Sequence, residues 1–126
     1  METQKAGRPL VTGQVIITAT TPAFDNATAH IYLEDISLAD APAVIVAETT
    51  LPMLRHALAD ADTTVPFTLI TSNPAPIDTR RYYAVRVWID CDNNGQKSPG
   101  DLYSDQVYPV LTRGFGDSVT IILVAK

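Results

Sequence analysis

The segment at residues 82–89, YYAVRVWI, constrains the fold more than any other part of the chain. Its odd-numbered positions hold a tyrosine, two valines and an isoleucine, whereas its even-numbered positions include Arg86 and Trp88. Successive side chains of a β-strand point to opposite faces, so this alternation predicts a strand with one apolar face. We expect that face to pack in a core.

Six other segments have the same extended character, and turn-forming residues separate them. Strands are predicted at residues 10–20, 27–35, 44–50, 65–71, 102–110 and 118–124, with Pro109 interrupting the run at 102–110. Residues 51–62 mix spacings around a proline and are predicted as a loop with at most one helical turn. Seven to eight strands with almost no helix predict an all-β fold, an antiparallel Greek-key β-sandwich or small barrel. Residues 1–9 are predicted as a flexible tail and residues 10–126 as a single β-sandwich domain.

Two residues inside these strands carry predictions about position. Gly13 interrupts an otherwise regular strand, which indicates a bulge or a close approach of another chain segment. Pro66 cannot donate a backbone hydrogen bond, so its strand is predicted to lie at a sheet edge or to begin there.

Composition and motifs narrow the class of function. The chain has 126 residues and a formal net charge of −5, which argues against nucleic acid as a partner because phosphate binding needs a basic surface. Its apolar runs are far shorter than the roughly 20 residues of a transmembrane helix, so no transmembrane segment is expected. No nucleophile motif or phosphate-binding glycine loop is present. We therefore predict that the protein is not an enzyme and has no catalytic residues.

The single cysteine, Cys91, excludes an internal disulfide and lies between Asp90 and Asp92. Neighbouring negative charge should raise the pKa of its thiol, which argues against a reactive thiolate. The first residues, METQKAGRPL, lack the apolar run of a secretory signal. We expect a periplasmic or outer-membrane-anchored protein if a signal has been removed, and a cytoplasmic protein otherwise.

Three motifs in a fixed order carry a resemblance to a known family. These are LEDISLADAPAVIVAE at residues 33–48, VPFTL with IDTRRYYAVRVWI at residues 65–89, and YPVLTRG at residues 108–114. Over residues 10–124 the chain resembles the YbaY/YscW-type lipoprotein family, which includes the pilotins, chaperones of type III secretion secretins. The resemblance implies a β-sandwich of the bacterial envelope without enzymatic activity, and a protein partner there. It does not identify that partner.

The sequence DCDNNGQKSPGD at residues 90–101 departs from that family, which usually has a short hairpin there. Its spacing matches a twelve-position calcium loop, with Gly95 at the position that needs glycine. The predicted ligands are the side chains of Asp90, Asp92, Asn94, Ser98 and Asp101 and the backbone carbonyl of Gln96. Ca²⁺ bound in this way would be structural. The alternative is a simple hairpin connection, in which Asn94-Gly95 forms a type I′ turn.

Two functions follow from these features. The first is a pilotin-like binding or assembly module that calcium stabilises. The second is a calcium-stabilised adhesion-like or carbohydrate-binding module, in which Tyr82 and Trp88 share an exposed face as an aromatic platform. That face is either exposed to solvent or packed against the second layer of the sandwich. We favour packing against the second layer. The cluster of Arg80, Arg81 and Arg86 is expected to pair with the abundant acidic residues.

Overall fold

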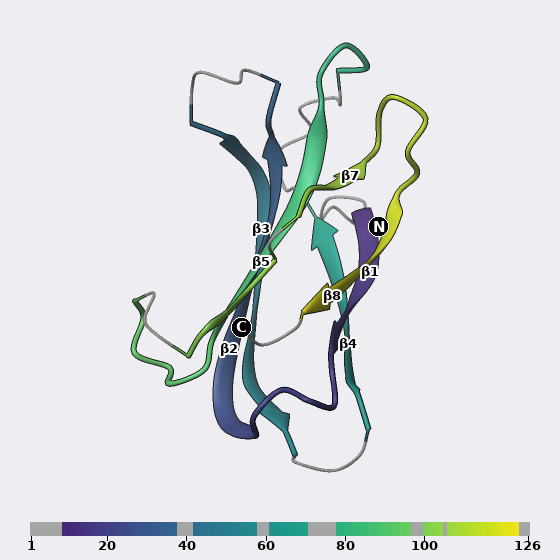
Figure 1. Ribbon diagram of the computed structural model, residues 1–126. Helices are drawn as coiled ribbons and strands as arrows, with labels where there is room; N and C mark the ends of the chain where they lie inside the picture. The colour runs from purple at the N-terminus through teal and green to yellow at the C-terminus, as the bar shows by residue number, and fades with distance from the viewer. Residues whose placement is uncertain are drawn as a thin grey trace, which may run out of the picture.

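The computed structural model describes residues 9–37, 42–57, 61–70, 78–96, 100–104 and 106–123. These residues form eight strands and no helix (Figure 1). The strands are β1 (Pro9–Ile17), β2 (Phe24–Asp35), β3 (Val44–His56), β4 (Thr63–Ile70), β5 (Tyr83–Asp90), β6 (Leu102–Tyr103), β7 (Tyr108–Val110) and β8 (Ser118–Leu123). The all-β prediction is confirmed. In the described ranges there is no helix that could cross a membrane. Residues 1–8 of the predicted tail lie outside them.

The strands form two sheets, and the chain passes from one sheet to the other several times. One sheet has three strands in the order β4-β1-β8, and the other has the order β3-β2-β5-β6 with β7 also paired to β5. All neighbours are antiparallel except β1 and β8, which run parallel. Figure 1 shows the two sheets as facing layers. At one side of the sandwich, β3 of one sheet lies against β4 of the other.

The core lies between the layers and follows the predicted alternation. Ile31 and Leu33 of β2 are fully buried. The odd-numbered residues of β5, its inner row, lie beside them in the same sheet, with Val87 paired to Ile31. Val15 and Ile17 of β1 and Ile121 of β8 close the core from the three-stranded sheet. The even-numbered face of β5 points away from this core. The expectation that this face packs against the second layer is therefore wrong.

Residues 51–56, which were predicted as a loop, instead continue β3 to His56. Ala27 pairs with Leu54 and Ala29 with Leu51, so β3 contains an extra residue and bulges at Pro52-Met53. Met53 takes the left-handed backbone conformation with φ of 60°. Because β3 lies at the edge of its sheet, the missing N–H of Pro52 costs no ladder hydrogen bond.

His56 ends β3 as a fully buried polar link to two other segments. Its Nε2 lies 3.1 Å from the carbonyl oxygen of Thr21, which can only accept, so Nε2 carries the proton. Its Nδ1 lies 2.7 Å from the hydroxyl of Thr63. The imidazole thus fixes the β1–β2 connection against the start of β4.

Gly13 and Pro66 behave as their residue types predict. Pro66 lies in β4, at the edge of the three-stranded sheet, opposite Gln14. At Gly13, a Cβ atom would clash with the carbonyl oxygen of Val119 and lie 2.8 Å from the ring of Phe67. Glycine therefore allows β1 to approach both of its neighbours closely.

We expect Gly13→Ala to lower the free energy of unfolding by about 2 kcal/mol, because the added methyl group meets a backbone oxygen that cannot move aside without disturbing β8. Urea denaturation measures the change. Gly116→Ala is the matched control, since a Cβ there would have no neighbour within 4 Å. Equal stability of the Gly13→Ala variant and the wild type would contradict the proposed close packing.

Candidate functional site

The polar loop leaves the sheet at Asp90, the last residue of β5, whose side chain is 1% exposed. One carboxylate oxygen accepts a hydrogen bond from the amide of Gly95 at 2.7 Å, and the other accepts from the amide of Asn94 at 3.2 Å. The side chain of this buried aspartate therefore folds the loop back over the end of its own strand.

Asp101 anchors the other end of the loop. Its Oδ1 accepts a hydrogen bond from the amide of Cys91 at 3.0 Å, and its Oδ2 accepts from the indole Nε1 of Trp88 at 3.0 Å. Asp101 precedes β6, so these bonds tie the start of β6 to the end of β5 beyond the two backbone-paired residues.

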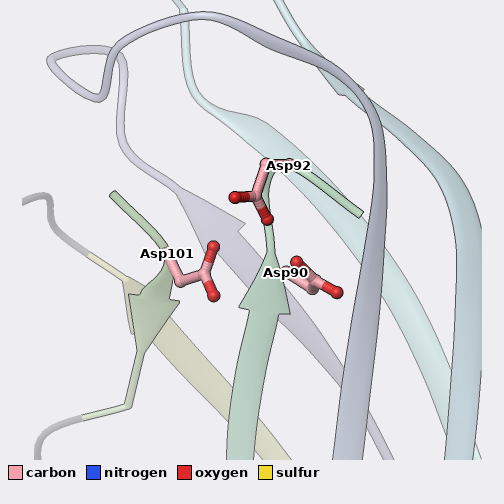
Figure 2. A group of neighbouring side chains, drawn as sticks. All are labelled: Asp90, Asp92 and Asp101. Carbon is pink, nitrogen blue, oxygen red and sulfur yellow. The ribbon is translucent and has the colours of Figure 1, made fainter. Parts of the chain in front are cut away.

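The loop brings together three of the six predicted metal ligands. Asp90, Asp92 and Asp101 each place a carboxylate oxygen within 4.8 Å of the other two, around the end of β5 (Figure 2). The Asn94 side chain donates to Asp92 at 3.2 Å and accepts from the amide of Gln96 at 2.9 Å. Ser98 lies outside the described residues. The three aspartates that the calcium-loop spacing selects therefore also lie close together in the structure.

A simple type I′ turn at Asn94-Gly95 is not what this loop forms. Such a turn needs positive φ at both central residues. Here the positive values fall at Asn93, with 55°, and at Gly95, with 80°. Asn93 also accepts a hydrogen bond from the hydroxyl of Thr28 at 2.7 Å, which fastens the loop to β2. The hairpin alternative is therefore wrong in its turn type.

The pKa of the Asp90 carboxyl reflects two opposing causes. Burial raises it, but hydrogen bonds from the Gly95 amide, with the Asp92 side chain and from the Asn94 amide outweigh burial, and the pKa lies below its ordinary value. Asp90 therefore keeps its charge at neutral pH although water scarcely reaches it.

Cys91 has a thiol that is protonated at neutral pH. Burial is the main cause that raises its pKa to about 11, and the charge of Asp101 adds to it. The sequence predicted the direction of this shift, but from neighbouring charge alone. The larger contribution of burial could not be seen there, because it depends on the packing of the half-buried side chain against the core.

The outer face of the five-stranded sheet does not present Tyr82 and Trp88 as one platform. Trp88 is 7% exposed, and the ring of His30 stacks on it with centroids 4.4 Å apart. Tyr82 precedes β5, and the guanidinium of Arg113 lies over its ring at 5.5 Å. Each ring thus has one face covered by another side chain of this protein.

Nearly the whole chain matches a known protein family. The family described as type III secretion system lipoprotein chaperone (YscW) matches residues 6–123. The chain belongs to the YscW family. A search of curated proteins found no match.

A solved structure shares the fold of this YscW family member. It is described as an alternative pilotin from the type II secretion system of Vibrio cholerae. The two are 24% identical, with a TM-score of 0.64, over 92% of this chain and 95% of that one. The two-sheet arrangement is therefore found in another protein along nearly its whole length.

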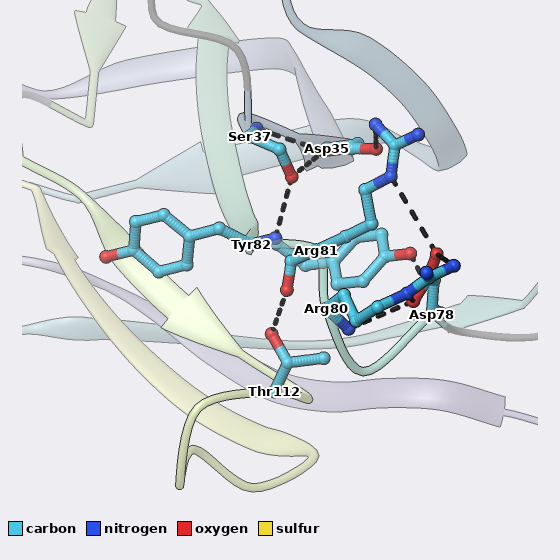
Figure 3. A network of polar contacts seen from close by, with 8 residues as sticks. Asp35, Ser37, Asp78, Arg80, Arg81, Tyr82 and Thr112 are labelled. Atoms are coloured by element: carbon cyan, nitrogen blue, oxygen red, sulfur yellow. Dashed lines mark hydrogen bonds and ion pairs between the residues drawn. The ribbon is translucent and has the colours of Figure 1, made fainter.

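The family motif that precedes β5 holds together the end of the molecule opposite the polar loop (Figures 1 and 3). Asp78 pairs with Arg80 at 3.2 Å, and Arg81 pairs with Asp35 at 3.3 Å. The carbonyl of Arg81 accepts from the buried hydroxyl of Thr112 at 2.6 Å. These bonds join β2, the approach to β5 and the β7–β8 connection.

The third arginine of the predicted cluster is also paired. Arg86 lies 2.8 Å from Glu34 across the β2–β5 pair, and its guanidinium lies over the ring of Tyr32 at 4.6 Å. The prediction that the arginines pair with acidic residues is confirmed. Glu34 and Asp35, adjacent in sequence, serve two different arginines on opposite faces of β2.

We expect Cys91 to react slowly with iodoacetamide at pH 7.5 and faster as the pH rises towards 11, because only the thiolate is the nucleophile. Mass spectrometry over a pH series measures the rate. The same protein in concentrated urea is the control and should react with the pH dependence of an ordinary cysteine, with a pKa of about 8.5. A half-maximal rate of the folded protein below pH 9 would contradict the packing described.

Proposed function

We propose that this protein is a non-enzymatic chaperone of the pilotin type, which binds a secretin and assists its assembly in the bacterial envelope. The observation that carries the proposal is the family match over residues 6–123, nearly the whole chain. The fold shared with the Vibrio cholerae pilotin supports it. Binding rather than catalysis also agrees with arginines that pair with acidic residues across the fold, as Arg81 does with Asp35 and Arg86 with Glu34.

Capture of the secretin from the native organism tests this proposal. We expect the tagged protein, crosslinked in detergent-solubilised envelope, to enrich the secretin at least about tenfold over a tagged globular protein of equal net charge, since specific association survives washing that removes weak electrostatic contacts. Cells without the protein should contain less assembled secretin multimer on native gels. Failure to enrich a secretin that is present in the extract would refute the proposal.

We further propose that the loop at residues 90–101 binds Ca²⁺ as a structural ion. The three clustered carboxylates support this, together with the left-handed Gly95 at the position where a calcium loop needs glycine. The amide hydrogen bonds to Asp90 and Asp101 do not preclude it, because each ionised carboxylate offers about four lone-pair sites. Weak binding is expected, with a Kd on the order of 10⁻⁴–10⁻³ M, as in extracellular modules.

Thermal unfolding in EDTA and in about 10 mM CaCl₂ tests the ion. For a Kd of about 1 mM, mass action gives a stabilisation of about 1.4 kcal/mol, which raises the Tm by about 5 °C. Asp92→Asn should abolish most of that rise, because it removes an exposed carboxylate from the cluster. The control Asp117→Asn, an exposed aspartate before β8, should keep it. Equal melting temperatures of the wild type in both buffers would exclude a stabilising ion.

A further inference from the structure

A cavity of about 220 Å³ opens beside the polar loop, between two segments that are distant in sequence. The β1–β2 connection, from Thr21 to Phe24, forms one wall. Cys91 and residues 100–102 form the other. Figure 1 shows both segments at the same end of the sandwich, away from the network around Arg81.

Both walls of the cavity are held in place by contacts with other parts of the sandwich. The buried residue Thr21 is bonded through its carbonyl to His56, and the ring of Phe24 lies 5.7 Å from that imidazole. Asp101 is fixed by the Cys91 amide and the Trp88 indole. A cavity with walls fixed in this way is formed before any ligand arrives, which lowers the entropy cost of binding.

The size and lining of the cavity favour one apolar side chain. Pockets that enclose a drug-sized molecule measure about 300–1,000 Å³, which is more than this cavity offers. Pro22, Ala23, Phe24 and Leu102 give it apolar walls. Buried apolar anchors surrounded by polar contacts are typical of protein interfaces.

The charge beside the cavity favours a basic segment. Asp101 lines the cavity, and oxygens of Asp90 and Asp92 lie within 4.8 Å of its carboxylate. None of the described lining residues is basic. Arg55 lines a separate hollow, which shares Ala23 and Phe24 with this cavity and is also lined by Asp25. Complementary charge at an interface attracts such a segment and rejects an acidic one.

We propose that this cavity is the anchor site for the protein partner and receives one apolar side chain from a segment that carries lysine or arginine beside it. The inference rests on the proposed function, which requires a protein partner, and names the surface and the chemistry of the segment that binds. In the calcium-free protein Asp92 and Asp101 face the basic residues, while Phe24 and Leu102 contact the apolar one.

Synthetic peptides test the chemistry directly. The probe is a nine-residue glycine-serine peptide with a central leucine between two lysines, added in EDTA so that no Ca²⁺ neutralises the carboxylates. We expect amide NMR shifts concentrated at Ala23, Cys91 and Leu102. Replacing the peptide's leucine by alanine should weaken binding about tenfold, since a buried leucine side chain loses most of its apolar contact. Replacing both lysines by glutamate should weaken it at least as much.

A pair of matched variants tests the location. Ala23→Trp places an indole in the cavity from an exposed position, and Ala43→Trp makes the same change at an exposed site before β3. We expect Ala23→Trp to weaken binding of the lysine peptide by about tenfold or more, and Ala43→Trp to change that affinity by less than about twofold. Thermal melts establish that both variants are folded. Shifts that map elsewhere, or equal binding of the glutamate peptide, overturn the inference.

The same variants separate this inference from the proposed function. We expect wild type and Ala43→Trp to capture the secretin and Ala23→Trp to lose it. If all three capture it equally, the cavity is not the anchor site, although the chaperone proposal stands. If the wild type captures no secretin but binds the lysine peptide in the cavity, the proposed partner is wrong and the anchor chemistry stands.

Discussion

The register of β2 against β5 is the constraint on which both the core and the polar loop depend. It places His30 opposite Trp88 and Thr28 opposite Asp90 on the outer face, while Ile31 and Val87 meet on the inner one. A slip of one residue would exchange the two faces of either strand. The register also presents Trp88 and Asp90 at the end of β5, where the indole binds Asp101 and the carboxylate binds the loop amides.

Much of the fold follows from local patterns in the sequence. The alternation at residues 82–89 identified the inner row of β5, and Gly13 and Pro66 indicated a close approach and a sheet edge. The prediction failed at residues 51–56, because their mixed spacing around Pro52 shows no strand alternation. An edge strand with a bulge at Pro52-Met53 tolerates the proline, and edge position is a property of the whole sheet. The side of β5 that faces the second layer likewise depends on the whole fold.

The candidate site divides in the same way. Clustering of Asp90, Asp92 and Asp101 could be predicted because their spacing lies within one loop. The cavity beside them could not, since one wall comes from residues 21–24 and the other from residues 91 and 100–102. His56, a residue with no recognisable motif, helps to fix the first wall through its bond to Thr21. The indole bond to Asp101 also had no signal in the sequence beyond the presence of an even-numbered tryptophan.

The parallel pairing of β1 with β8 has a consequence for how the chain reaches this structure. The first described strand hydrogen-bonds along Thr12 to Ile17 to the last one, so the three-stranded sheet needs contacts across more than a hundred residues. Such non-local pairing slows folding, because the chain loses the entropy of closing a long loop before the stabilising contacts form. During synthesis the inner row of β1 lacks β8 until that strand has emerged. The three-stranded sheet of this topology therefore stays incomplete until β8 has been synthesised, although the other sheet needs no strand beyond β7.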